Sequence, residues 1–490
     1  MNINKFLKIF LILLVPIFLF GATVIVIIIT QGGKVTDKGI VNETGIIRIN
    51  VDPANITFDT YIDDQKVVLQ SNSSVNIPEG EHTVRIETQE MIPWEKNIMV
   101  TKGIVNEVNA KLFSSNLALS KITTSNVDQI SFTSNSEFLF YVIKDSSFPV
   151  EKGIWRMQLT TNNFAFFNQE IKPVKFFEIT DPQISTILAS SYEIIPTNDG
   201  NKIVLVDKTN NKYLVISNQQ NLSGNTLNII DINDKIGFTP SSAQWMNFNN
   251  SLLIKEGTSL FDYNVNTGVL SVIKYSKDTQ TVYASNISQL LIYDSKKNSL
   301  LSYKNSLLTP IVLPVGLLPL DINKIYLSKN NNNYLFIETT TQYKLLDLEN
   351  LVIIDIAPVG IIHSIAPDGL GIVVIALDKS LNSYTIKEDL VSNIISIKFS
   401  KLDASLGEDN HLKYIPQSSH LLYFEKNASK IFAFDKDGTN KIMLIENANI
   451  TNGFDFDNTG RNLFLMLVDG KTAEGKSNSN IYKINIIQNQ

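Results

Sequence analysis

A unit of short apolar strands separated by polar turns repeats about eight times between Asn116 and the C-terminus, and this repeat limits the possible folds more than any other feature. Its clearest copies are IAPDGLGIVVI at 365–375 and FDNTGRNLFLM at 456–466, in which a turn containing Gly369 or Gly460 joins two apolar runs. Most copies are followed by a further strand-like run. Weaker copies with the same pattern lie at 132–141, 195–206, 246–254, 283–293, 327–337 and 414–424.

The spacing of the copies indicates the architecture. The second strands of successive copies are spaced roughly 40 to 50 residues apart, which is the length of a four-stranded propeller blade. The first interval is longer because residues 164–179 add strand-like material. The sequence therefore predicts a β-propeller over residues 116–490, with eight blades, or seven if the faint copy at 246–254 or 283–293 is not a blade. These second strands start near Phe138, Ile203, Leu252, Leu290, Tyr334, Ile372, Leu421 and Leu463.

The two ends of the repeat region predict how the ring closes. The last copy stops at IYKINI (481–486) and leaves no sequence for a fourth strand. The segment LALSKIT (117–123), which precedes the first copy, can supply that strand. Such pairing removes the exposed sheet edge that an open array would present.

Composition agrees with a large all-β chain. Of the 490 residues, 43% are hydrophobic and only 18% are charged, so there is ample apolar surface for several sheet interfaces. No long stretch after residue 30 has a sustained helical period, which argues against a helical solenoid.

The N-terminal segment predicts a membrane anchor. Residues 9–29 contain no charge, and their 21 residues span about 32 Å as a helix, enough for a bilayer core. A cleaved signal peptide is the alternative, but the apolar run at 24–29 continues past the small residues that would offer a cleavage site. We expect residues 1–8 in the cytoplasm, a single-pass transmembrane helix at 9–29, a linker at 30–44, and the C-terminal domains outside the cell membrane.

Residues 45–113 form a separate unit with alternating strands and the turn IPEGEH, in which Pro and Gly mark a reversal of the chain. The pattern predicts a small β-sandwich. Its expected strands lie at 46–51, 56–63, 74–77, 82–87, 96–100 and 105–113.

Within this unit, Pro78, Glu79 and Gly80 are followed by His82, Val84 and Ile86, a combination that resembles the signature of the PEGA domain family. Pro53 and Trp94 also match that pattern. The resemblance covers about 70 residues and implies an extracytoplasmic accessory module without known catalysis, in which Pro78, Glu79 and Gly80 are structural. A chemical role for Glu79 or His82 is the less favoured alternative.

The repeat region in turn resembles TolB-like and WD40-like propellers, most clearly at the hairpin Pro367-Asp368-Gly369. Turns of this kind are common in propellers. The resemblance therefore implies the fold and leaves the function open.

Motifs for catalysis and metal binding are scarce. The chain has no Cys, which excludes thiol nucleophiles and Cys-ligated zinc, and only four His, at 82, 363, 411 and 420. It contains no HExxH, G-x-S-x-G or phosphate-binding loop. We therefore predict no catalytic, cofactor-binding or metal-binding residues. The acidic segments 435–440 and 455–458 suggest calcium loops, but β-turns are the favoured interpretation.

A net charge of −6 without a basic cluster argues against nucleic acid as a partner. The favoured hypothesis is a membrane-anchored, extracytoplasmic binding or scaffold protein of the bacterial cell envelope, whose partner is an envelope protein or glycan. The alternative is an envelope enzyme (lyase, glycosidase or cyclotransferase) with carboxylates from separate blades. Acidic residues, or His363 with an acid, at one mouth of the channel would favour the enzyme, whereas a lining of apolar and Asn side chains would favour binding.

Overall fold

The computed structural model places most of the chain. It describes residues 15–16, 18–23, 34–36, 39–41, 44–146, 148–159, 172–221, 224–246, 249–275, 282–286, 288–304, 306–328, 331–389, 394–405, 411–418, 420–446, 449–471, 475 and 477–487.

The predicted cytoplasmic segment 1–8 and most of the predicted membrane helix 9–29 lie outside the described residues. Within that helix, residues 15–16 and 18–23 are helical and exposed. Among the helices that the structure describes, none has the length and apolar character needed to cross a bilayer. In the predicted linker, strands β1 (Lys34–Thr36) and β2 (Gly39–Val41) pair as a short antiparallel ladder.

The chain divides into two compact units. One contains residues Met1–Asn116 and Ile486–Gln490, and the other contains Leu117–Asn485.

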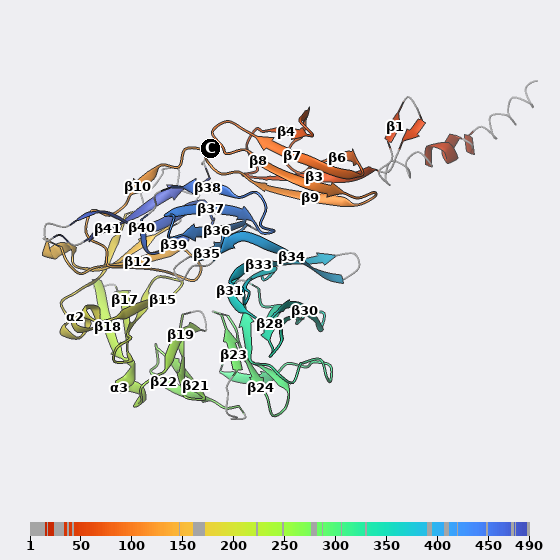
Figure 1. Cartoon of the computed structure of the whole chain (residues 1–490). Helices are drawn as coiled ribbons and strands as arrows, with labels where there is room; N and C mark the ends of the chain where they lie inside the picture. The colour runs from red at the N-terminus through yellow and green to blue at the C-terminus, as the bar shows by residue number, and fades with distance from the viewer. Residues whose placement is uncertain are drawn as a thin grey trace, which may run out of the picture. The chain divides into compact units, whose positions relative to one another are not determined.

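The first unit holds two sheets (Figure 1). Their apolar faces share one core, which includes Ile49 from the first sheet and Val84 and Trp94 from the second. This is a small β-sandwich. Strand β4 is shorter than the predicted strand at 56–63, and β5 was not predicted. The first sheet has the order β6 (Ser73–Pro78), β3 (Thr44–Asp52), β9 (Val105–Lys111), and the second has the order β5 (Gln65–Val67), β4 (Asp59–Ile62), β7 (Gly80–Glu87), β8 (Trp94–Val100).

The second unit is a β-propeller. Its described residues form eight four-stranded antiparallel sheets, which follow one another around a common centre in Figure 1. The first four sheets are β11 (Gln129–Phe132), β12 (Phe138–Ile143), β13 (Gly153–Gln158), β14 (Val174–Glu178); β15 (Tyr192–Pro196), β16 (Lys202–Asp207), β17 (Lys212–Asn221), β18 (Gly224–Asp231); β19 (Ser242–Met246), β20 (Ser251–Glu256), β21 (Ser259–Asn264), β22 (Val269–Ile273); and β23 (Val282–Ser285), β24 (Leu290–Asp294), β25 (Ser299–Lys304), β26 (Leu307–Pro310).

The remaining sheets have the same order of strands, except that the last one gains a strand from the start of the unit. They are β27 (Lys324–Leu327), β28 (Tyr334–Glu338), β29 (Gln342–Asp347), β30 (Val352–Pro358); β31 (Ile361–Ile365), β32 (Gly371–Ile375), β33 (Ser380–Asp389), β34 (Ile394–Ser405); β35 (His411–Tyr414), β36 (His420–Glu425), β37 (Lys430–Asp435), β38 (Ile442–Ile445); and β39 (Ile450–Phe456), β40 (Asn462–Lys471), β41 (Ser477–Asn485), β10 (Leu119–Lys121).

The first strand of each sheet is the innermost. Contacts between neighbouring sheets join first strands: β11 contacts both β15 and β39, β23 contacts β27, and β31 contacts β35. The second strands carry unbroken runs of buried residues, such as LLIYD in β24 and YLFI in β28. Neighbouring sheets cover both faces of these strands, which is why their sequences are continuously apolar instead of alternating.

The predicted ring closure is confirmed. Strand β10 pairs with β41 in the register Leu119 with Ile484, Ser120 with Lys483 and Lys121 with Tyr482. In the described part of this unit, two short α-helices and a 3-10 helix at Pro149–Glu151 were not predicted. The α-helices are α2 (Pro182–Ala189), which begins at the N-cap Asp181, and α3 (Ile232–Ile236). Each is too short to show a sustained helical period, and α2 contributes to the long first interval of the repeat.

Candidate functional site

The turns between the first and second strands gather at one end of the ring, because every sheet starts with its innermost strand. Polar side chains in these turns join successive sheets. The Ser134 hydroxyl donates to Asn198 Oδ1 (2.6 Å), and the Asn198 backbone N–H donates to Asn249 Oδ1 (3.1 Å). Further round the ring, Asn331 Nδ2 donates to the Asp368 carbonyl (2.8 Å). These bonds hold the turns in a fixed arrangement.

A cavity of about 270 Å³ opens among these turns; we call it the mouth cavity. Four Asn side chains contribute to its lining, together with Trp245 and other apolar residues. The Trp245 indole N–H donates to the Ile195 carbonyl (2.8 Å), which orients the ring. The lining residues are Ser134, Asn135, Ile195, Pro196, Asn198, Gln244, Trp245, Asn249, Ser285, Asn286, Leu327 and Ser328.

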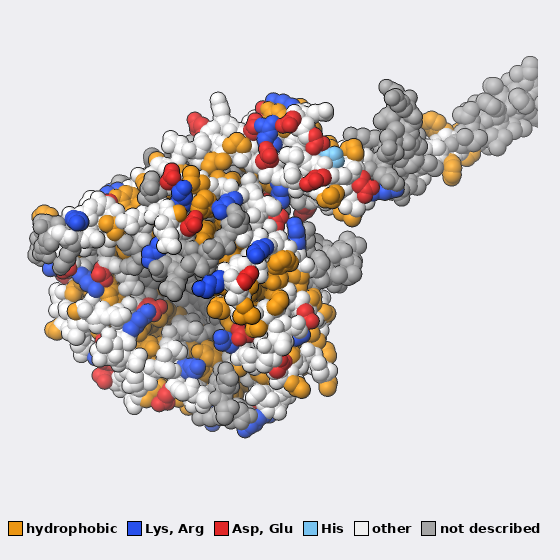
Figure 2. Space-filling model, viewed as in Figure 1, with side chains coloured by type: hydrophobic (Ala, Val, Ile, Leu, Met, Phe, Trp, Pro, Cys, Tyr) orange, Lys and Arg blue, Asp and Glu red, His pale blue; other side chains and the backbone are white. Residues whose placement is uncertain are grey.

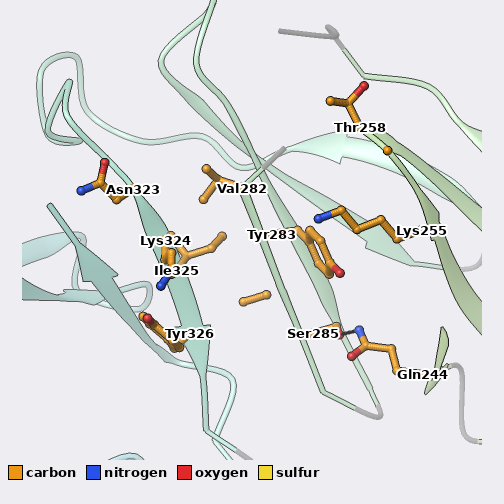
Figure 3. Close-up of a pocket in the computed structure, with 12 residues that line it drawn as sticks. Gln244, Lys255, Thr258, Val282, Tyr283, Ser285, Asn323, Lys324, Ile325 and Tyr326 are labelled. Carbon is orange, nitrogen blue, oxygen red and sulfur yellow. Dashed lines mark hydrogen bonds between the residues drawn. The ribbon is translucent and has the colours of Figure 1, made fainter. Parts of the chain in front are cut away.

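A larger cavity of about 500 Å³, the channel cavity, is lined by the innermost strands β19, β23 and β27, together with the end of β20 and the turn that follows it (Figure 3). Figure 3 shows Lys255 beside Tyr283, with Lys324 and Tyr326 across the cavity from them. The lining residues are Gln244, Lys255, Gly257, Thr258, Val282, Tyr283, Ala284, Ser285, Asn323, Lys324, Ile325 and Tyr326.

Gln244 and Ser285 line both cavities. Gln244 Nε2 donates a hydrogen bond to Ser285 Oγ, drawn as a dashed line in Figure 3, and so links strand β19 to strand β23. This polar bridge lies where the two cavities meet.

Two tyrosine hydroxyls at or behind the wall of the channel cavity share one carboxylate. The Tyr326 hydroxyl donates to Glu338 Oε2 (2.6 Å), and the Tyr343 hydroxyl donates to the same oxygen (3.3 Å). Burial, and then the carboxylate of Glu338, raise the pKa of Tyr343 to about 12, and burial followed by the same carboxylate raises the pKa of Tyr326 as well. Lys324 Nζ lies 4.0 Å from Glu338 Oε1.

Among the described residues that line the two cavities, none carries a carboxylate. The mouth cavity has the apolar and Asn lining that the sequence analysis associates with binding. The His363 side chain, which was weighed for catalysis, lies outside the described residues.

His411 and His420, the nearest histidine pair in the sequence, have different surroundings. His411 is exposed, whereas His420 is buried. His420 Nδ1 is 2.8 Å from Ser418 Oγ, and His420 Nε2 is 2.9 Å from Asp435 Oδ1. These are the residue types of a Ser-His-Asp triad. Because the His420 side chain is only 5% exposed and lines neither cavity, we assign the cluster a structural role.

Each acidic segment begins at the end of a strand and continues into a turn, which agrees with the favoured interpretation. Asp435 ends β37, and the Gly438 N–H donates to its carbonyl (2.8 Å). Asp457 Oδ1 accepts hydrogen bonds from the Thr459 hydroxyl (2.9 Å) and the Arg461 N–H (3.1 Å). Asp455 pairs with Lys413 (2.8 Å). Within the described part of the chain, no group of three or more His, Asp or Glu could hold a metal ion.

In the first unit, the residues of the PEGA-like signature form the turn between two strands. Pro78 ends β6, Gly80 begins β7 with φ of 141°, and Glu79 is exposed between them. His82 Nδ1 bonds Asp63 Oδ2 (2.6 Å) and His82 Nε2 bonds the Pro78 carbonyl (2.9 Å). The hydrogen bond from His82 lowers the pKa of Asp63. His82 thus ties one turn to another.

The outer surface of the propeller has an open groove of about 420 Å³ on the sheet β31–β34, lined in part by Leu377 and Phe399, which are 93% and 55% exposed. Figure 2 shows hydrophobic side chains gathered where Figure 1 labels β30 and β31, while acidic and basic side chains are interspersed elsewhere on the visible face.

The residues that line the channel cavity were not predicted from the sequence. Along β23, buried Val282 and Ala284 alternate with partly exposed Tyr283 and Ser285. All four residues line the cavity, so this short alternation, which is typical of an ordinary half-buried strand, gives no local signal of a cavity.

No known protein family model matches this sequence, and no curated protein does. Among solved structures, the WD40 domain of SCAP from fission yeast aligns with a TM-score of 0.43 at 9% identity, over 75% of this chain and 98% of that one. The β-propeller domain of Cps50 (Swd1) from Myceliophteria thermophila aligns with a TM-score of 0.34 at 10% identity, over 76% and 100%. Dipeptidyl peptidase 4 from Porphyromonas gingivalis aligns with a TM-score of 0.41 at 12% identity, over 72% and 59%.

Proposed function

We propose that this chain is a binding protein of the bacterial cell envelope, whose eight-bladed propeller holds a polar ligand in its central channel. The observation that carries the proposal is the lining of the mouth cavity by Asn135, Asn198, Asn249 and Asn286 around Trp245. Amide side chains offer both donors and acceptors, and an indole offers a flat apolar face. A few oriented polar groups beside an apolar surface are typical of ligand sites.

The mouth is organised before any ligand arrives. Asn198 and Asn249 are already fixed by hydrogen bonds between successive sheets, and Trp245 is fixed by its bond to Ile195. A ligand would therefore bind with little cost for ordering these side chains, which favours affinity.

The N-terminal segment completes the proposal. Residues 9–29 anchor the chain in the cell membrane, and the PEGA-like sandwich and the propeller lie outside the cytoplasm. Protease added to intact cells, after removal of any outer barrier, should then degrade the propeller. Full protection of the propeller until the cells are lysed would contradict this topology.

Glycan and peptide arrays probed with the detergent-purified full chain test the binding function. We expect a hit whose affinity falls about tenfold or more in Trp245→Ala, since aromatic anchors dominate binding energy. Trp155→Ala is the matched control, because the Trp155 indole also donates to a carbonyl, that of Glu151 (2.9 Å), but lies outside both cavities. Equal losses in both variants, or no hit on either array, would overturn the proposal.

A further inference from the structure

We infer that the channel cavity binds an acidic saccharide, that is, a ligand with a carboxylate group next to several hydroxyl groups. This inference rests on the proposed binding function and names the class of ligand.

The charge of the cavity favours an anion. Lys255 and Lys324 both line it, and none of its described lining residues is acidic. No ion pair joins Lys255 to another described residue; its ammonium lies 5.7 Å from the centre of the Tyr283 ring. Among the described residues, Lys324 pairs with the carboxylate of Glu338, which is at 4.0 Å and accepts hydrogen bonds from Tyr326 and Tyr343. A ligand carboxylate could therefore pair with the ammonium groups of both lysines without breaking a short ion pair.

This positive charge is local. The whole chain carries a net charge of −6, so its surface is not generally basic. The presence of two lysines and no carboxylate among the described lining residues is therefore a property of this cavity. Charges placed in a concave site attract oppositely charged ligands more strongly than the same charges on an open surface.

The other lining groups favour a sugar over a simple anion. Gln244 and Asn323 carry amides, and Ser285 carries a hydroxyl, so each can both donate to and accept from sugar hydroxyls. Tyr283 and Tyr326 add aromatic faces on two sides of the cavity (Figure 3). A volume of about 500 Å³ is within the range of small-molecule sites and is large enough for a disaccharide.

Isothermal titration calorimetry on the full chain tests this inference with three probes: digalacturonic acid, the neutral disaccharide galactobiose, and the acidic peptide triglutamate. We expect digalacturonic acid to bind at least about tenfold more tightly than either of the others. Its affinity should fall as the salt concentration rises, because the pairing is ionic.

Lys255→Met and Lys324→Met should each weaken digalacturonate binding by about tenfold or more. The control is Lys304→Met, since Lys304 is exposed, ends strand β25 and lines neither cavity. Thermal unfolding of each variant identifies any that misfold. The salt dependence of the wild-type chain and the comparison of the three probes test the inference without any variant.

The inference is overturned if galactobiose or triglutamate binds as tightly as digalacturonic acid. It is also overturned if digalacturonic acid does not bind up to about 10 mM, or if its binding is insensitive to salt and to both Lys substitutions. A neutral or peptide array hit that is sensitive to Trp245→Ala would leave the proposed function standing while this inference fails. The absence of any array hit would remove both.

Discussion

Lys121 on strand β10 donates a hydrogen bond to Asp469 on strand β40, across the intervening strand β41. Asp469 also accepts from the Tyr482 hydroxyl (2.6 Å) and from Asn480 Nδ2 (3.0 Å). Burial by itself would raise the pKa of Asp469, but the hydrogen bonds to its carboxylate, from Lys121 first, lower it. Because β10 begins the propeller and β40 and β41 end it, this contact lies at the closure of the ring.

We predict that Asp469→Asn lowers the free energy of unfolding by about 1 to 3 kcal/mol near neutral pH, the typical cost of losing hydrogen bonds to a charged group. The pKa of Asp469 in the folded state is below its unfolded-state value of about 3.9. The ionised carboxylate therefore contributes its full stabilisation above about pH 3.9, and this stabilisation is lost as the pH falls through the folded-state pKa. The difference in the free energy of unfolding between Asp469→Asn and the wild type should therefore become smaller below about pH 4. Urea unfolding of the full chain at a series of pH values measures it.

Asp355→Asn is the control for this prediction. Asp355 also pairs with a lysine, Lys344, but its side chain is 64% exposed and the pair lies within one sheet away from the closure. Exposed ion pairs contribute about 0 to 1 kcal/mol. If the two substitutions destabilise the chain equally at neutral pH, Asp469 has no special part in closure.

Thr123 makes a second polar contact at the closure. Its hydroxyl accepts from the Ile481 N–H (2.9 Å) and donates to Asn480 Oδ1 (3.1 Å), and the side chain is 6% exposed. Thr123→Val keeps the shape but leaves a buried N–H and a buried amide oxygen without this partner, so we expect a loss of about 1 to 3 kcal/mol. Thr309→Val, at an exposed site, should change stability by less than about 0.5 kcal/mol. A comparable loss in both variants in urea unfolding would contradict the assignment.

Much of the propeller could be predicted because its second strands have a distinct sequence. Each predicted start of a second strand, from Phe138 to Leu463, falls on the first or second residue of such a strand in the structure. Burial on both faces demands four or more consecutive apolar residues, and this signal is local. Even the faint copies at 246–254 and 283–293 each contribute to a four-stranded sheet.

The cavities could not be predicted because, unlike the second strands, they have no local sequence signal. The channel cavity combines Gln244, Tyr283 and Tyr326 from three sheets about 40 residues apart in sequence, on strands of only four or five residues. A pattern that short is indistinguishable from an ordinary half-exposed strand. Helix α2 was missed because its start signals, the N-cap Asp181 and Pro182 at the first helical position, belong to a helix of only eight residues.

Gly460, one of the turn glycines that marked the repeat, should tolerate no side chain. Its φ is +66°, and a Cβ there would lie 2.5 Å from the carbonyl oxygen of Pro416 in the preceding sheet. Gly268 has a similar φ of +71°, but a Cβ there would meet nothing closer than the Tyr263 hydroxyl at 4.0 Å. We predict that Gly268→Ala costs about 1 kcal/mol for the positive φ alone, and Gly460→Ala about 2 to 4 kcal/mol.

Thermal and urea unfolding of both glycine variants measure this difference. Equal costs would show that the Pro416 backbone shifts easily, and that the turns of neighbouring sheets are packed less tightly than the structure indicates.

The Ser418, His420 and Asp435 cluster gives the last prediction, which separates a structural histidine from a catalytic one. Ser418 Oγ accepts from the His420 backbone N–H (3.2 Å) as well as contacting its ring, and the ring is enclosed between Ser418 and Asp435. We therefore expect a fluorophosphonate probe, which labels activated serines, to leave the full chain unmodified.

His420→Ala should instead destabilise the chain by about 2 to 4 kcal/mol, because it empties a buried site and removes the imidazole beside the buried Asp435 carboxylate. His411→Ala, at the exposed end of β35, should cost less than about 1 kcal/mol. Labelling of the wild type that disappears in Ser418→Ala would reverse this assignment, since only a reactive hydroxyl produces that result. If His420→Ala loses stability and the probe does not label the wild-type chain, the three residues serve to hold strand β36 against strand β37.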